Sequence, residues 1–132
     1  MSTELSLAAW ALVLAVIQLL LPAMARNRET GIGYNAGPRD RPGPPMGTMT
    51  ARLFRAQSNL FETLPLFLAA VVINHLAGVE GSMTLWGCWL YLLARVIYLP
   101  LYAFGVPWLR SLVWAVGLFG LVLLILNLLI PG

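Results

Sequence analysis

The chain has few charged side chains for its length, and none of them is lysine. Of its 132 residues, only 10% are charged, whereas 60% are hydrophobic, and the mean hydropathy is +0.83. A soluble domain carries about a quarter of its residues as Asp, Glu, Lys and Arg. This shortage of charge excludes a soluble globular domain and predicts a membrane protein.

Cysteine and histidine occur once each, as Cys88 and His75. One cysteine excludes an intrachain disulfide, and its position in an apolar run predicts a small buried hydrophobic side chain. A single histidine does not predict a metal site, because such sites need several His, Cys or carboxylate ligands. We therefore expect no metal, and we expect His75 to lie at the membrane interface.

Long apolar runs, in contrast, are abundant, and they predict four helices at about residues 4–25, 52–78, 83–104 and 107–130. About 20 helical residues span the roughly 30 Å hydrocarbon core of a bilayer. The first run lacks the basic start and short apolar centre of a signal peptide, so we interpret it as a permanent span. Uninterrupted apolar runs fit helices rather than a β-barrel. The predicted fold is a single all-α integral membrane domain over residues 1–132, a four-transmembrane-helix bundle.

The arginines gather near one end of these helices. They are Arg26, Arg28, Arg39, Arg41 and Arg52 in or beside the loop 26–51, and Arg110 near the third loop. Loops rich in positive charge face the cytoplasm, so this multi-pass protein should have its long first loop in the cytoplasm and both termini on the opposite side. The isoelectric point of about 9.6 therefore indicates topology, and we expect no nucleic-acid partner.

The loop 26–51 is rich in glycine and proline and has no helical periodicity. At about this length a loop is either functional or disordered. Two interpretations stay open: a lid or wall of a binding site, and a solvated linker.

Polar side chains share one face of the second predicted helix, within RLFRAQSNLFETLP. Arg52, Arg55, Asn59 and Glu62 stand at positions i, i+3, i+7 and i+10. The third predicted helix repeats the pattern with Tyr91, Arg95, Tyr98 and Tyr102 at i, i+4, i+7 and i+11. Both helices therefore carry a polar stripe through an apolar segment.

These two helices should run antiparallel, because a tight turn near residues 79–82 joins them. Counting outward from residue 80 places Asn59 level with Tyr102 and Glu62 level with Tyr98. Arg95 then lies within about one turn of Glu62. Charges inside a membrane are costly, so we expect these two to pair or to line a wet cavity.

The fourth predicted helix starts in GVPWLRS, where Pro107 suits a first helical turn. Arg110 and Ser111 follow at the cytoplasmic edge, where free helix N–H groups favour an anion. The convergent polar groups describe a basic cavity with one carboxylate. Guanidinium groups pair with carboxylates, so a small zwitterion with extra carboxylates would fit.

The segment RLFRAQSNLFETLPLFLA resembles the second-helix signature of the MAPEG family, the membrane-associated proteins of eicosanoid and glutathione metabolism. That signature has the form R-A-x-x-N-x-x-E followed by proline, and here it is Arg55, Ala56, Asn59, Glu62 and Pro65. The amino-acid sequence of this segment is especially similar to that of the leukotriene-forming members. The resemblance extends to Arg95, Tyr98 and Tyr102, and to Arg110 with Ser111.

The resemblance implies a homotrimer with glutathione, the co-substrate, bound between adjacent subunits near the cytosolic face. It implies a glutathione transferase acting on lipophilic electrophiles dissolved in membrane lipid, or a peroxidase if the acceptor is a lipid hydroperoxide. The implied catalytic residues are Arg110, which would stabilise the thiolate, and Ser111 as the alternative. The implied glutathione-binding residues are Arg52, Arg55, Gln57, Asn59, Glu62, Arg95, Tyr98 and Tyr102.

The chain departs from the family pattern at Ser58, where some relatives carry arginine, at Trp114, where some carry tyrosine, and in its longer first loop. Three alternatives stay open. Glu62 and Arg95 could pair only to hold the bundle together. The chain could be a non-catalytic lipid-binding member of the same fold. It could also be a small efflux transporter, which needs a carboxylate in the first helix, where only Glu4 occurs.

Overall fold

The computed structural model describes residues 1–40 and 43–130, so Arg41 lies outside the described residues. The helices, in chain order, are α1 (Thr3–Thr30), α2 (Ile32–Ala36), α3 (Thr48–Ala77), α4 (Ser82–Ala103) and α5 (Pro107–Leu129). Four of them, all except α2, are long and apolar enough to cross a membrane. No strand occurs in the described ranges. The predicted all-α four-helix membrane fold is confirmed.

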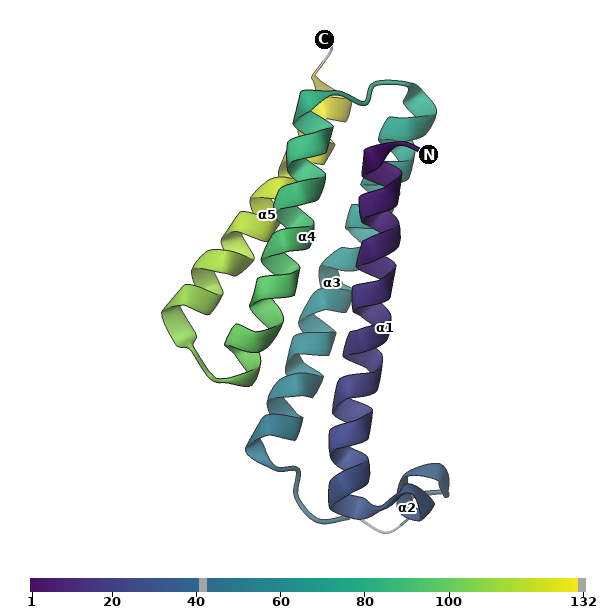
Figure 1. Ribbon diagram of the computed structural model, residues 1–132, viewed down its shortest axis with the longest axis vertical. Coiled ribbons are helices and arrows are strands. Elements are labelled where there is room, and N and C mark those ends of the chain that lie inside the picture. The colour runs from purple at the N-terminus through teal and green to yellow at the C-terminus, as the bar shows by residue number, and fades with distance from the viewer. Residues whose placement is uncertain (41–42, 131–132) are drawn as a thin grey trace.

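The four long helices run up and down as two closely packed pairs, α1 with α3 and α4 with α5 (Figure 1). Both termini and the α3–α4 connection lie at one end, which we call the termini end. The α4–α5 connection and the segment joining α1 to α3 lie at the other, the loop end. At the loop end α1 and α3 continue past the α4–α5 connection, so this part of the molecule stands clear of the four-helix bundle.

An aromatic contact between α3 and α4 marks the middle of the core. The rings of Phe67 and Tyr91 stack with centroids 4.0 Å apart, and the hydroxyl groups of Tyr91 and Thr63 are 2.8 Å apart. Tyr91 is only 1% exposed, and its hydroxyl has a partner, as a buried tyrosine requires. Tyr91 is therefore a packing residue and not part of a ligand site.

The α4–α5 pair packs closely because glycines face each other. A Cβ atom added at Gly120 would lie 2.6 Å from the carbonyl oxygen of Gly87, and one added at Gly87 would lie 2.7 Å from that of Gly120. Small residues at such positions let two membrane helices approach through their backbones. This contact places the start of α5 beside the end of α4.

The register of α3 against α4 differs from the predicted one. Asn59 lies level with Arg95, whose Nη1 donates to Asn59 Oδ1 at 2.8 Å, and not with Tyr102. The cause is the end of α3, where Gly78 is left-handed (φ 70°) and the N–H of Val79 donates to the carbonyl of Asn74. This Schellman turn folds Val79 back beside Asn74. The antiparallel count therefore starts about one helical turn earlier than residue 80.

Helix α1 ends five residues later than the predicted boundary at residue 25, at Thr30. An ion pair between Arg26 and Glu29 (3.0 Å) and a hydrogen bond from Thr30 Oγ1 to the Arg26 carbonyl support this polar final turn. Apolar periodicity marks only the part of a helix that is buried in protein or lipid, so it could not reveal this extension.

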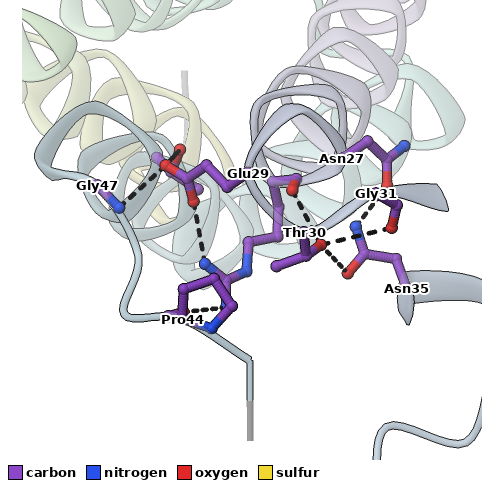
Figure 2. A network of polar contacts seen from close by, with 9 residues as sticks. Asn27, Glu29, Thr30, Gly31, Asn35, Pro44 and Gly47 are labelled. Atoms are coloured by element: carbon purple, nitrogen blue, oxygen red, sulfur yellow. Dashed lines mark hydrogen bonds and ion pairs between the residues drawn. The ribbon is translucent and has the colours of Figure 1, made fainter. Parts of the chain in front are cut away.

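Helix α3 begins four residues earlier than the predicted residue 52, at Thr48. Glu29 Oε2 accepts hydrogen bonds from the N–H of Gly47 (3.0 Å) and from Thr50 Oγ1 (2.9 Å) (Figure 2). One carboxylate of α1 thus holds the start of α3. The connection between the two helices is therefore shorter than the predicted loop 26–51, and it contains the short helix α2.

Candidate functional site

A cavity of about 280 Å³ lies toward the loop end between α3, α4 and α5. Its walls combine one amide, two phenols, one guanidinium, one hydroxyl and one indole. The lining residues are Asn59, Tyr98, Tyr102, Arg110, Ser111 and Trp114. Five of these six residues are predicted site residues, so the helical spacing brings together most of the expected polar wall.

Arg110 reaches the cavity from the first turn of α5. Pro107 occupies the start of this helix, where its missing N–H costs no intrahelical hydrogen bond. The Arg110 guanidinium lies 4.7 Å from the centre of the Tyr102 ring, in range of a cation–π contact. The hydroxyl of Ser111 donates to the Pro107 carbonyl at 3.3 Å. A guanidinium and a helix N-terminus therefore face the same cavity, and both favour an anion.

Tyr102 is held between two arginines. Arg55 Nε donates to its hydroxyl at 3.1 Å, while Arg110 lies over its ring. The neighbouring ring of Tyr98 is 5.6 Å away and tilted by 59°. Two positive charges from different helices thus flank one phenol, which makes this wall strongly cationic.

Arg52 closes the loop end of the site without lining the cavity. Its Nη1 donates to the carbonyl of Ala103 at 3.4 Å, joining the start of α3 to the end of α4. The guanidinium packs against Gly105, where an added Cβ would lie 2.8 Å from Arg52 Cζ. Gly105 also has φ +72°, a conformation that favours glycine.

Arg95 lies behind the cavity wall and is only 2% exposed. Its guanidinium binds Asn59 Oδ1 and lies 4.3 Å from the centre of the Tyr98 ring. Its Nε and Nη2 have no partner among the residues that the structure describes. In that part of the chain it forms no ion pair, so the predicted pairing with Glu62 is wrong. Glu62 is exposed, and Arg95 binds Asn59 instead.

Two other predicted residues lie away from the cavity within one chain. Gln57 turns toward α1, where its Nε2 donates to the carbonyl of Gln18 at 3.0 Å. Glu62 is exposed and makes no hydrogen bond to any described residue. Neither lines the cavity. The structure therefore brings together Asn59, the two tyrosines and the α5 pair, and leaves these two residues outside.

Trp114 is the cavity residue that the predicted site omits. It stands four residues after Arg110, so both side chains lie on one face of α5. That spacing was the available signal, but an indole near a membrane surface also fits an interfacial anchor. Its place in the wall gives the cationic cavity one large apolar side.

Neither α1 nor the described part of the α1–α3 connection lines this cavity. None of the six lining residues comes from the α1–α3 connection, so the proposed lid or wall is not part of this cavity. Glu4 lies at the termini end, where its Oε2 accepts from Thr84 Oγ1 at 2.7 Å. The transporter alternative needs a carboxylate in the first helix, and Glu4 lies away from the cavity. No group of His, Cys, Asp and Glu able to hold a metal occurs within residues 1–40 and 43–130.

Fold and site together define an integral membrane protein of four spanning helices with a cationic cavity at one end. The family model of the MAPEG family matches residues 7–130, nearly the whole chain. The chain therefore belongs to the MAPEG family, which makes it a membrane protein of the glutathione and eicosanoid metabolism kind. No match was found among curated proteins or among solved structures.

Proposed function

We propose that the chain is a membrane-bound glutathione transferase whose cavity between α3, α4 and α5 binds the thiol tripeptide. One observation carries the proposal: Asn59, Tyr98 and Tyr102 line the same cavity as Arg110 and Ser111. Hydrogen-bonding groups that can hold a peptide thus lie beside a cation that can stabilise a thiolate.

Glutathione has two carboxylates, one ammonium group and one thiol, and the side chains around the cavity complement these charges. The guanidinium groups of Arg52 and Arg55 lie on the loop-end side of Tyr102 and suit a carboxylate. The amide of Asn59 suits the peptide backbone. The exposed carboxylate of Glu62 suits the ammonium group of the ligand.

The chemistry depends on the thiol. A free thiol has a pKa near 8.5, and a nearby cation lowers it, so more thiolate exists at neutral pH. Arg110 supplies that cation. The Ser111 hydroxyl, which donates to the Pro107 carbonyl, would donate to the sulfur only after turning away from that carbonyl. The thiol proton passes to water, and the thiolate attacks an electrophilic carbon. A C–S bond forms as the bond to the leaving group breaks, and that group departs with the electron pair.

A lipid hydroperoxide would be reduced at the same place. The thiolate attacks the terminal peroxide oxygen and the O–O bond breaks, which leaves a glutathione sulfenic acid. The released lipid alkoxide takes a proton from water and becomes the lipid alcohol. A second glutathione thiol then displaces water from this sulfur and forms glutathione disulfide. The indole of Trp114 offers an apolar wall at which either acceptor could arrive from the membrane.

A homotrimer, which the family resemblance implies, is part of the proposal. At about 280 Å³ the cavity lies just below the usual volume range of small-molecule sites. Glu62 lies outside it and is exposed. A neighbouring copy placed over this face would enclose the rest of the ligand, with the cavity on the cytoplasmic side of the membrane.

Ultraviolet difference spectroscopy on detergent-purified protein titrated with glutathione tests the proposal. We expect a saturable thiolate absorbance that Arg110→Ala abolishes. Arg28→Ala is the matched control, because it removes the same charge from the exposed end of α1, away from this cavity. If calorimetry shows that glutathione binds but no thiolate forms, Arg110 only holds the ligand and does not activate its thiol. The absence of binding would contradict the proposal and favour a non-catalytic lipid-binding protein.

A further inference from the structure

A second cavity, of about 360 Å³, lies at the loop end between α1, α2 and the first turns of α3. Its walls include Arg26 and Arg39, the amide of Asn35, and the apolar side chains of Ala23, Met46 and Phe54. It shares no lining residue with the first cavity. It is therefore a separate site that combines positive charge with an apolar side.

Arg26 is occupied by the protein itself. Its Nη1 forms the ion pair with Glu29, and its Nη2 donates to the carbonyl of Pro44 at 2.6 Å. Glu29 also binds the N–H of Gly47, as Figure 2 shows. These contacts tie the segment around residues 43–47 to α1. The charge of Arg26 is thus neutralised, and its role in the cavity wall is structural.

Arg39 carries the uncompensated charge. Its Nε donates to the carbonyl of Asn35 at 2.8 Å, and its two terminal amino groups have no partner in the described part of the chain. Its backbone has φ 58°, an uncommon conformation for a residue other than glycine. Such conformations cluster at ligand sites, where the surroundings hold them. The neighbouring Asp40 lines no wall of the cavity and makes no ion pair with any described residue.

Asn35, which anchors Arg39, is itself fixed to the end of α1. Its Oδ1 lies 2.8 Å from Thr30 Oγ1, and its Nδ2 donates to Asn27 Oδ1 (Figure 2). Helix α2 is therefore fastened to α1 through side chains as well as through the backbone. Arg39 therefore follows a segment that is fixed to α1 by hydrogen bonds, and its guanidinium faces the cavity from there.

The apolar side of this cavity continues onto the membrane surface of α1. Counting back from Ala23 by helical spacing gives Leu19, Val16 and Leu12, which lie on the same face. Their side chains are exposed at 47%, 52% and 50%. An apolar stripe thus leads from the cavity along the transmembrane part of α1.

From these observations we infer that the second cavity binds the anionic head group of a membrane amphiphile. The phosphate or carboxylate would pair with the terminal amino groups of Arg39, as guanidinium groups pair with both anions. The acyl chain would pass Phe54 and Met46 and lie along the stripe on α1. The site is independent of the proposed glutathione chemistry.

Isothermal titration of the full-length protein in an uncharged detergent tests this inference. The probes are dioleoyl phosphatidylglycerol, oleate and inorganic phosphate, with dioleoyl phosphatidylcholine as the reference lipid. We expect at least one of the two anionic amphiphiles to bind saturably, and Arg39→Gln to weaken that binding about tenfold, as loss of a charge-assisted contact should. Arg28→Gln is the matched control, because Arg28 is an exposed arginine that does not line the cavity.

The two amphiphiles distinguish a phospholipid from a free fatty acid as the occupant. Circular dichroism checks that Arg39→Gln keeps its helices, and Arg39→Lys, which keeps the charge without the fork, should bind with intermediate affinity. Glutathione titration of Arg39→Gln should be unchanged, so failure here and failure of the proposed transferase are distinguishable. Equal binding of inorganic phosphate, equal losses in the Arg39 and Arg28 variants, or no saturable binding would overturn the inference.

Discussion

Arg95 is a buried charge with one hydrogen bond and two unpaired nitrogens among the described residues. A charge buried with incomplete partners destabilises a fold, and an apolar replacement of similar volume is often neutral or stabilising. Its hydrogen bond nevertheless fixes the amide of Asn59, which lines the cavity. Arg95 is thus a positioning residue. It lowers the stability of the fold, and in return it holds the side chain of Asn59 in place.

Arg95→Met should therefore separate stability from binding. We expect an unchanged or higher melting temperature in detergent, together with glutathione binding about tenfold weaker, because the orientation of Asn59 is lost. Thermal unfolding and calorimetry measure the two effects, and Asn59→Ala should weaken binding to a similar degree. A clearly lower melting temperature, or unchanged binding, would show that Arg95 serves only to hold the bundle together.

At the residue scale, sequence spacing predicts the site where each side chain projects from a long regular helix. Asn59, Tyr98 and Tyr102 converge as the stripes indicate, and Arg110 joins them from α5. Spacing fails for Gln57, because the choice between facing α1 and facing the cavity depends on how α3 is rotated against two neighbours. That rotation depends on packing between helices and not on any local pattern.

At the element scale, the close contact of α4 with α5 sets the position of the cavity. A Cβ at position 120 would meet two backbone atoms, Gly87 O at 2.6 Å and Tyr91 N at 2.8 Å. Neither atom can move without shifting its helix. The same helix contains Gly117, where a Cβ would meet only side chains, with Ala94 Cβ nearest at 3.3 Å.

We expect Gly120→Ala to lower the free energy of unfolding by about 1–3 kcal/mol, the usual range for overpacking. Gly117→Ala, the control, should have a much smaller effect, since alanine favours a helix over glycine by about 1 kcal/mol and offsets a slight contact. Because Gly120→Ala pushes α5 away from α4, it should also weaken glutathione binding at Arg110. Equal melting temperatures for the two variants would contradict this assignment.

The sequence predicts the helices themselves well, but it does not predict the register in which one helix packs against another. Apolar runs and the turn residues between them are local signals, so the four spans were predicted correctly. The register of α3 against α4 depends on a Schellman turn at Gly78, which shortens the paired length of α3. The polar ends of α1 and α3 depend on Glu29, whose partners Gly47 and Thr50 are distant in sequence.

For the whole molecule, the two ends differ in charge. The loop end carries Arg26, Arg28, Arg39, Arg52, Arg55 and Arg110, whereas Glu4, Glu80 and His75 lie at the termini end. At the termini end the carboxylate of Glu80 binds Ser2 and His75. The described residues there include no arginine, so they carry no charge that favours the cytoplasm. The positive-inside bias depends on arginine and lysine, so this asymmetry favours a cytoplasmic loop end.

Cysteine labelling in sealed, right-side-out membrane vesicles tests this orientation. The single native cysteine, Cys88, is buried, and Cys88→Ala provides a background without thiols. Added to it singly, Ala36→Cys reports on the loop end and Ser82→Cys on the termini end, since both positions are exposed. We expect a membrane-impermeant maleimide to label the Ser82 variant in sealed vesicles and the Ala36 variant only after detergent opens them. The reverse pattern would place the cavity and its arginines outside the cytoplasm, where a cytosolic thiol tripeptide could not reach them.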